Sequence, residues 1–223
     1  EDNQDITYGN VTCLYQDQGN TLYVGTDGSG IFAIELGTED AIINYTTDDG
    51  LNSNVITSME RGEEGIWIGT DNGLCLYNES FRAISNIEYS NSIYDIVLSD
   101  GAVWIIGSMG VLYSTEEELL GSEGVSGRYF DANDGLTKTL NTISNSTIDA
   151  NGILYLCCND GICTLDTKNI PYNSVAPRIK VTAIDVDGTI YEFDDLANGL
   201  KIESDVSRIA IDFAVFSYNN RSN

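Results

Sequence analysis

One apolar phrase occurs four times in this chain of 223 residues, and it constrains the fold more than any other feature. Each copy surrounds a Trp or Tyr, and the first two copies end in Gly-Thr-Asp. The copies are Leu22–Asp27, Ile66–Asp71, Val103–Ser108 and Leu154–Asn159. They recur at intervals of roughly 40 to 50 residues, a period typical of folds that stack equal supersecondary units. We therefore expect a repeat protein.

The residues around each copy have the pattern of short antiparallel strands. An alternating apolar run comes first, a turn rich in Asp, Asn and Gly follows, and the Trp/Tyr strand then leads through a second glycine turn into a third strand. A weaker fourth strand, such as residues 41–46, completes the unit. Four antiparallel strands per unit are typical of one blade of a β-propeller. The sequence therefore predicts an all-β fold with about four four-stranded blades over residues 1–173.

This pattern resembles the two-component regulator propeller repeat. Asp49–Tyr77 matches it nearly throughout, and Asn10–Ile34 matches with Tyr23 in place of Trp. The third copy is interpreted as dropping one residue in its Gly-Thr turn, and the fourth has Cys157-Cys158 in place of Gly-Thr. Propellers close with about 4 to 8 blades, and those of this family usually need about seven. The resemblance therefore implies an incomplete propeller here.

The pattern changes after Pro171 and Pro177. An alternating strand enters a hairpin over residues 178–188, and a second apolar strand covers residues 209–218. This tail resembles the start of the Y-Y-Y domain, on the matching residues Ala176–Ile179, Asp187-Gly188 and Phe213–Tyr218. The resemblance implies that residues 174–223 form the N-terminal part of an immunoglobulin-like β-sandwich.

Charge and composition exclude several classes of function. Lys and Arg number 10 against 35 Asp and Glu, so the net charge is −25, and histidine is absent. Nucleic acid and anionic membranes would repel such a surface. Without histidine, the Ser-His-Asp and Cys-His nucleophile systems cannot form within this chain. No run of 18 apolar residues and no signal-peptide pattern occurs. We expect a protein that is not an enzyme.

Neither a cofactor nor a metal ion is expected. The five cysteines form no CxxC pair and are interpreted as small buried hydrophobic residues rather than as metal ligands. The segment Asp185–Gly188 is similar to the start of a calcium loop, but Leu196 stands where that loop needs a bidentate Glu. An Asp-Gly hairpin turn explains it better.

The repeated phrase itself is interpreted as scaffold. Its aromatic residues, which could stack on a sugar ring, are assigned to packing between blades. The glycines Gly25 and Gly69 are attributed to turn geometry, and Thr26 and Thr70 to hydrogen bonds at strand ends. The aromatic positions are Tyr23, Trp67, Trp104 and Tyr155.

The loops between the repeated strands provide the candidate binding site. In a propeller of this type they share one face, and their polar side chains could hydrogen-bond a polyol or sugar. The alternative is that the same residues only form turns. The candidate residues are Asp27, Ser29, Asn54, Asp71, Asn72, Asn141, Asn159 and Asp160.

The resemblance implies a ligand-sensing region outside the cytoplasm, belonging to a bacterial membrane signalling protein such as a sensor kinase. A small molecule, for example a carbohydrate, would be the ligand, and flanking segments would supply the membrane anchor. Two alternatives stay open: a polysaccharide-active enzyme with paired carboxylates, and a protein-interaction scaffold. The acidic runs Glu63-Glu64 and Glu116–Glu118 are interpreted as solvated loops that supply no such pair. Exposed edges of the first and last blades predict a homodimer.

Overall fold

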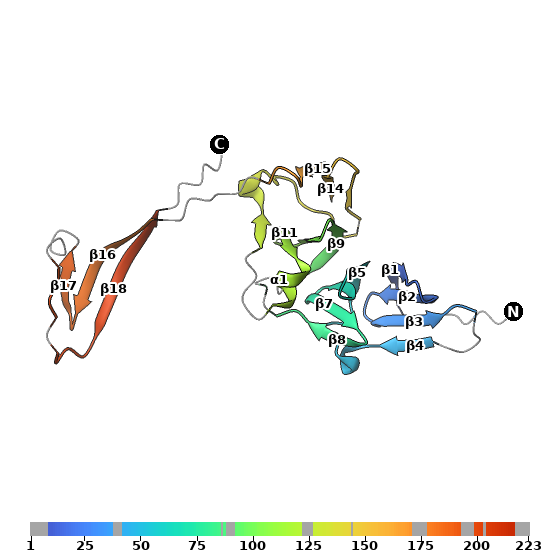
Figure 1. Ribbon diagram of the computed structural model, residues 1–223, viewed down its shortest axis with the longest axis horizontal. Helices are drawn as coiled ribbons and strands as arrows, with labels where there is room; N and C mark the ends of the chain where they lie inside the picture. The colour runs from blue at the N-terminus through green and yellow to red at the C-terminus, as the bar shows by residue number, and fades with distance from the viewer. Residues whose placement is uncertain are drawn as a thin grey trace. The chain divides into compact units, whose positions relative to one another are not determined.

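The chain folds into two compact units, Glu1–Asn169 and Ile170–Asn223, both built almost entirely of strands (Figure 1). The predicted boundary between residues 173 and 174 lies outside the described residues. The computed structural model describes residues 9–37, 42–85, 87, 92–121, 127–143, 145–170, 178–192, 199–202 and 204–216.

The first unit contains four antiparallel sheets whose strands lie in chain order. The first sheet has the strands β1 Val11–Gln16, β2 Thr21–Thr26, β3 Ile31–Glu35 and β4 Ile42–Tyr45. The second has β5 Ile56–Arg61, β6 Ile66–Thr70, β7 Gly73–Asn78 and β8 Ser80–Ala83. The third has β9 Ile93–Ser99, β10 Ala102–Gly107, β11 Gly110–Thr115 and β12 Arg128–Phe130. The fourth has, within the described residues, β13 Thr147–Ile148, β14 Ile153–Cys158 and β15 Gly161–Asp166.

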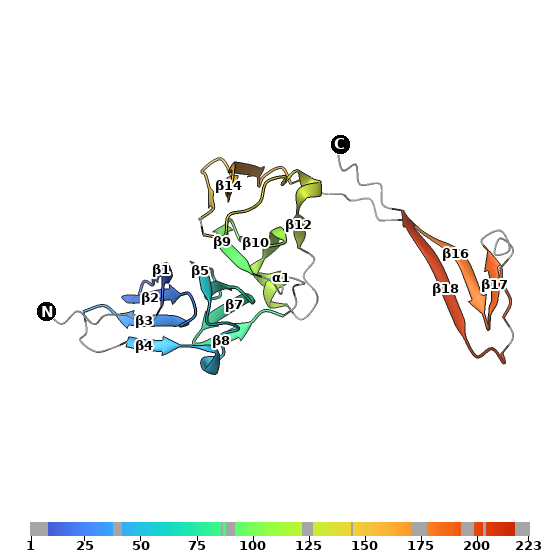
Figure 2. The same ribbon diagram turned by 180° about the vertical axis from the view of Figure 1, so that it is seen from behind.

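These sheets are the predicted propeller blades. The first strand of each blade contacts the first strand of the next, so that β5 touches β1 and β9, and β9 touches β13. Figure 2 shows the blades following one another in chain order. The first strands are therefore the inner strands of the propeller, and the fourth strands are the outer ones. The predicted all-β architecture with four-stranded blades is confirmed for the first three blades.

Apolar side chains fill the space between neighbouring blades. Trp67 of β6 is fully buried in a cluster with Leu74 of its own blade and with Ile93 and Ile105 of the third blade. Tyr23 packs its ring 6.1 Å from the ring of Tyr77 in the second blade. Packing between blades is thus confirmed for the aromatic residues of the first two copies.

The other two aromatic positions differ from that pattern. Trp104 is buried, and its ring lies 4.8 Å from that of Tyr113 in the same blade. Tyr155 is 36% exposed, and its hydroxyl lies 3.4 Å from the Asp149 carboxylate. Packing between blades stays a prediction for Tyr155, whose ring lies partly exposed on the fourth blade.

The glycines of the Gly-Thr phrase are needed for packing and not for a turn. Gly25 and Gly69 lie inside the buried strands β2 and β6. A Cβ atom at Gly25 would lie 2.8 Å from Cγ2 of Ile56, and one at Gly69 would lie 2.8 Å from Cγ2 of Ile93. In each case the isoleucine belongs to the inner strand of the next blade. The attribution to turn geometry is therefore wrong.

The threonines do form the predicted hydrogen bonds at the strand ends. Oγ1 of Thr26 donates to the Gly30 carbonyl at 2.8 Å, and Oγ1 of Thr70 donates to the Gly73 carbonyl at 2.8 Å. Each hydroxyl also accepts a backbone N–H of the turn, from Ser29 at 3.0 Å and from Asn72 at 3.1 Å. Both threonines are fully buried, so these bonds satisfy polar groups that water cannot reach.

The third copy of the phrase has no deletion. Thr70 pairs with Gly73 across the β6–β7 hairpin, and Gly107 pairs with Gly110 across the β10–β11 hairpin. The two turns are therefore of equal length, and Gly107 stands at the position of Thr70. The prediction that the third copy drops one residue is therefore wrong. The third copy carries Ile106 where the second carries Gly69, and its own glycine, Gly107, follows one position later.

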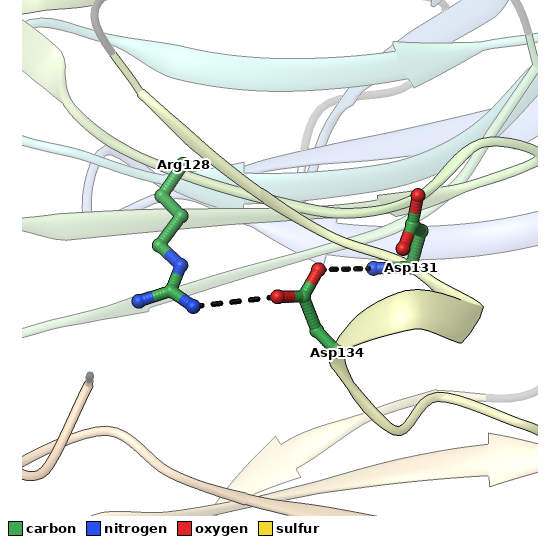
Figure 3. A network of polar contacts seen from close by, with 3 residues as sticks. All are labelled: Arg128, Asp131 and Asp134. Atoms are coloured by element: carbon green, nitrogen blue, oxygen red, sulfur yellow. Dashed lines mark hydrogen bonds and ion pairs between the residues drawn. The ribbon is translucent and has the colours of Figure 1, made fainter. Parts of the chain in front are cut away.

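The shared Asp-Gly-Leu phrase closes two equivalent turns. The 3-10 helices η1 Thr47–Asp49 and η2 Ala132–Asp134 both end at this phrase. The Asp49 carboxylate accepts the backbone N–H of Thr46 at 2.9 Å, and the Asp134 carboxylate accepts that of Asp131 at 3.2 Å (Figure 3). Asp134 also forms an ion pair with Arg128 at 3.4 Å. These turns connect the outer strand of one blade to the inner strand of the next.

A buried carboxylate joins the second and third blades. Glu116 begins the short helix α1 Glu116–Leu120 and is only 9% exposed. Its carboxylate accepts the backbone N–H groups of Glu63 at 2.9 Å and Glu64 at 3.2 Å, and the indole N–H of Trp67 at 2.9 Å. The interpretation of this acidic run as a solvated loop is therefore wrong for Glu116, because the neighbouring blade covers it.

The second unit is a three-stranded antiparallel sheet in the order β17-β16-β18. Its strands are β16 Arg178–Val186, β17 Thr189–Glu192 and β18 Ile209–Phe216. The predicted hairpin at Asp187-Gly188 is confirmed, since both residues have positive φ angles of 47° and 89°. Val181, Ile211 and Phe213 lie exposed on this sheet. An immunoglobulin-like sandwich needs a second sheet, which the described residues of this unit do not contain, so the Y-Y-Y resemblance stays a prediction.

Candidate functional site

The predicted loop residues lie in the turns that follow the second strands and precede the inner strands. Asn54 and Asn141 are half-buried, as is Ser29. The others are exposed: Asp27, Asp71, Asn72, Asn159 and Asp160. Ligand binding by these residues stays a prediction.

Several of these residues bridge turns through hydrogen bonds. The Asn54 carbonyl accepts the N–H groups of Gly28 at 3.1 Å and Gly30 at 2.9 Å, which ties the second blade to the first. The side-chain amides of Asn52 and Asn72 each donate to the other's backbone carbonyl, at 3.1 and 3.0 Å. These bonds favour the interpretation of Asn54 and Asn72 as turn-forming residues.

The remaining candidates have similar local partners. Oδ1 of Asn141 accepts the N–H of Ile143 at 2.9 Å. Asp160 forms an ion pair with Lys138 at 3.2 Å, and its carbonyl accepts from the same ammonium group at 2.9 Å. The Ser92 hydroxyl lies 3.4 Å from the carbonyl of Asp71, which again joins neighbouring blades.

A cavity lies along the inner strands and not at these loops. Its volume is about 570 Å³, within the range of roughly 300–1,000 Å³ typical of small-molecule sites. Residues from β1, β5 and β9 line it, together with residues 145–150 of the fourth blade. All four blades therefore contribute to one cavity wall.

Asp95 of β9 is the most buried ionisable group on this wall. It is 7% exposed, and its carboxylate accepts its own strand's Ile96 N–H at 2.9 Å and the Ser146 N–H of the fourth blade. Burial raises the pKa of Asp95 above its usual range, although these hydrogen bonds oppose the shift. The structure therefore keeps a carboxyl group where its charged form is disfavoured.

Glu60 of β5 lines the same cavity. Partial desolvation raises the pKa of Glu60, and the negative charge of Asp95 raises it further. The carboxyl group of Asp95 thus affects the ionisation of Glu60 on the adjacent inner strand. Sequence reasoning found no carboxylate pair, because Glu60 and Asp95 lie in different blades and meet only through the fold.

A β-bulge places three side chains at equivalent positions of the inner strands. The pairing register shifts between Val11 and Cys13 in β1 and between Ile56 and Ser58 in β5, and β9 shifts in the same way before Asp95. A bulge lets consecutive residues project to one side of the strand. The equivalent side chains are Cys13, Ser58 and Asp95, and all three line the cavity. Alignment of the repeat copies could have revealed this series.

The β5 bulge leaves two hydroxyl groups without hydrogen bonds. Oγ1 of Thr57 and Oγ of Ser58 are buried and find no partner among the described residues. Both lie near Gly69, since a Cβ atom there would be 2.9 Å from the first oxygen and 2.5 Å from the second. Buried polar atoms are normally paired, so this wall has unused hydrogen-bonding capacity.

The cysteines behave partly as predicted. Cys75 and Cys158 are buried, whereas Cys13, Cys157 and Cys163 are half-buried, and all five are free thiols. Burial raises the pKa of Cys13 and Cys75 to about 11, which keeps these thiols neutral near pH 7. Within the described ranges, no group of three or more His, Cys, Asp or Glu residues is placed to hold a metal ion.

Comparison with known proteins supports the propeller fold. Residues 5–28 and 50–72 match the family described as two component regulator propeller. A search of curated proteins found no match. In the described part of the chain, every helix is too short or too polar to cross a bilayer.

Two solved structures are similar over most of the chain. One is the extracellular domain assigned to the hybrid two-component system BT3049 of B. thetaiotaomicron, with a TM-score of 0.61 and 17% identity over 96% of this chain. The match covers 31% of that domain, so the present chain spans about a third of its length. The other is the computationally designed protein Ika4, with a TM-score of 0.51 and 15% identity over 71% of this chain and 92% of Ika4. At these identities the likeness shows the fold alone, which is that of propeller blades.

Proposed function

We propose that this chain is part of the ligand-sensing region of a bacterial membrane signalling protein, located outside the cytoplasm. The 570 Å³ cavity lined by all four blades is the observation that carries this function. The two segments that match the regulator propeller family support it, as does the similarity to an extracellular domain assigned to a two-component system. Segments beyond this chain would anchor the protein and carry the output domain.

A ligand screen tests the sensing function. The folded chain is heated with single compounds from a panel of neutral sugars, amino acids and amines. A compound that binds only the folded state raises its stability, by about 2.7 kcal/mol at a concentration of 100 times Kd. We expect at least one compound to raise the melting temperature in proportion to the logarithm of its concentration. If the whole panel leaves the melting temperature unchanged, the sensing function is wrong for this chain.

The pair Glu60 and Asp95 also supports a second candidate, an enzyme that cleaves polysaccharide. Such chemistry needs one carboxyl group that stays protonated and a second that is ionised. The pKa values of Glu60 and Asp95 are both raised, which favours the protonated form that the first of these two roles requires. The test is whether the chain releases reducing sugar from polysaccharides. Release by the wild type that is lost in Glu60→Gln would favour the enzyme over the non-catalytic sensor that we propose.

A homodimer is proposed from the exposed faces of the first and fourth blades. Leu14 of β1 is 62% exposed and Ile162 of β15 is 64% exposed. Tyr155 is partly exposed at the position where Trp67 is buried between two blades. We expect light scattering to give twice the chain mass, and the double variant Leu14→Lys/Ile162→Lys to give a monomer. A wild-type chain that is monomeric at high concentration contradicts the proposal.

A further inference from the structure

The wall of the inner-strand cavity is acidic. Glu60, Asp95 and Asp149 line it, and the described lining residues include no Lys or Arg. Asp149 is half-buried, and its carboxylate accepts the N–H groups of Asn151 and Ile153, each at 2.9 Å, so its charge is stabilised locally. Asp95 differs, because it is buried.

Hydrogen bonds to Asp95 come from the backbone N–H groups of Ile96 and Ser146 and from the side chain of Ser146. An ionised carboxylate removed from water is costly unless it is paired with a positive charge or fully hydrogen-bonded. A carboxylate has about four acceptor sites, so these donors still leave acceptor capacity unused. The cavity therefore holds a buried acid whose counter-charge is not provided by the described lining residues.

The neighbouring hydroxyl groups are a second and independent observation. Ser58 is 7% exposed and lines the same cavity, yet its Oγ has no hydrogen-bond partner in the described structure. Thr57 Oγ1, in the same bulge, is also buried and unpaired. Both oxygens lie on β5, and β5 packs directly against β9, which carries Asp95. Carboxylate and hydroxyl oxygens together form a set of acceptors.

We propose that this cavity binds a small organic cation, with an ammonium or guanidinium group that donates hydrogen bonds to Asp95 and to the hydroxyl groups of Ser58 and Thr57. This inference rests on the proposed sensing function and names the class of its ligand. An ammonium group carries three donors and no acceptor, which suits a wall of acceptors. The net charge of −25 concentrates cations near the chain, whereas a neutral sugar would leave the buried charge uncompensated.

Putrescine and 1,4-butanediol are the probes, because they share a four-carbon chain and differ in charge. Binding is measured by calorimetry and by melting temperature at fixed ionic strength. We expect putrescine to bind with saturation and 1,4-butanediol to show no binding. In Asp95→Asn, putrescine affinity should fall at least tenfold, and in Ser58→Ala by a smaller factor. Glu117→Gln, which removes an exposed charge outside the cavity, is the matched control and should bind as the wild type does.

The folded state of the variant is checked independently. Each carboxylate oxygen of Asp95 accepts one backbone N–H, Oδ1 from Ile96 and Oδ2 from Ser146, so the amide in Asp95→Asn loses one of these hydrogen bonds and should lower the melting temperature of the free protein. Loss of putrescine binding, measured at a temperature where Asp95→Asn is fully folded, therefore reports the missing charge. Equal putrescine affinity in Asp95→Asn and wild type overturns the proposal, as does an equal loss in Glu117→Gln.

The two proposals fail in different ways. If a neutral compound binds and putrescine does not, the proposal of a cationic ligand is wrong and the sensing function stays in place. If neither putrescine nor any compound of the wider panel binds, both proposals are wrong.

Discussion

Replacing Glu116 by alanine should lower the free energy of unfolding by about 3 kcal/mol. The buried carboxylate accepts N–H groups from Glu63, Glu64 and Trp67, all in the preceding blade. Hydrogen bonds to charged groups contribute about 1.5–3 kcal/mol each, and the donors left buried without an acceptor add a further cost. Chemical denaturation followed by circular dichroism measures the change. Glu117→Ala, at the exposed neighbouring position, should change stability by less than about 0.5 kcal/mol.

The two tryptophans provide a matched comparison for the same contact. Trp67 donates its indole N–H to Glu116, whereas the buried N–H of Trp104 finds no acceptor among the described residues. Trp→Phe removes the same volume at both sites, so Trp67→Phe should be the more destabilising variant by about 1–2 kcal/mol. The double variant Trp67→Phe/Glu116→Ala should cost less than the sum of its single variants. Equal costs for the two tryptophans would show that the indole–carboxylate bond contributes nothing measurable.

Gly30→Ala should destabilise the first blade by about 3 kcal/mol, whereas Gly28→Ala should cost only about 1 kcal/mol. Both glycines have positive φ angles, 75° and 103°, so both substitutions strain the backbone. A Cβ atom at Gly30 would also collide with the backbone carbonyl of Tyr45, while the space around Gly28 is open. The difference between the two variants therefore isolates the collision between β3 and β4.

Melting temperature and denaturant midpoint of both variants measure this effect. The carbonyl of Tyr45 belongs to a strand paired with β3, so it cannot move aside without breaking the ladder. A Gly30→Ala protein as stable as Gly28→Ala would mean that the outer strand moves freely, and would contradict the packing seen in the first blade.

Most of the fold was predictable from patterns of neighbouring residues in the sequence. The strands and their turns were predictable because apolar alternation and turn glycines depend on neighbouring residues only. The hydroxyl bonds of Thr26 and Thr70 and the Asp187-Gly188 hairpin belong to the same class of local features. The Y-Y-Y resemblance and the ligand role of the loop residues stay predictions.

Most of the errors concern contacts between blades. Gly25 and Gly69 were assigned to turns, although their small size makes room for isoleucines of the next blade. The register of the third copy was misjudged because Ile106 replaces a glycine without changing the turn length. Glu116 was taken for a solvated residue, since nothing in the run of acids shows which one a neighbouring blade covers.

The sequence by itself determined the repeating unit, because one blade is built from hairpins whose strand and turn signals lie within about 44 residues. Only the tertiary structure decided the site. Asp95, Ser58 and Glu60 belong to two blades and become one cavity wall when the inner strands pack side by side. The β-bulges that place Ser58 and Asp95 at equivalent positions arise from strand pairing, which the residues of a single strand do not determine.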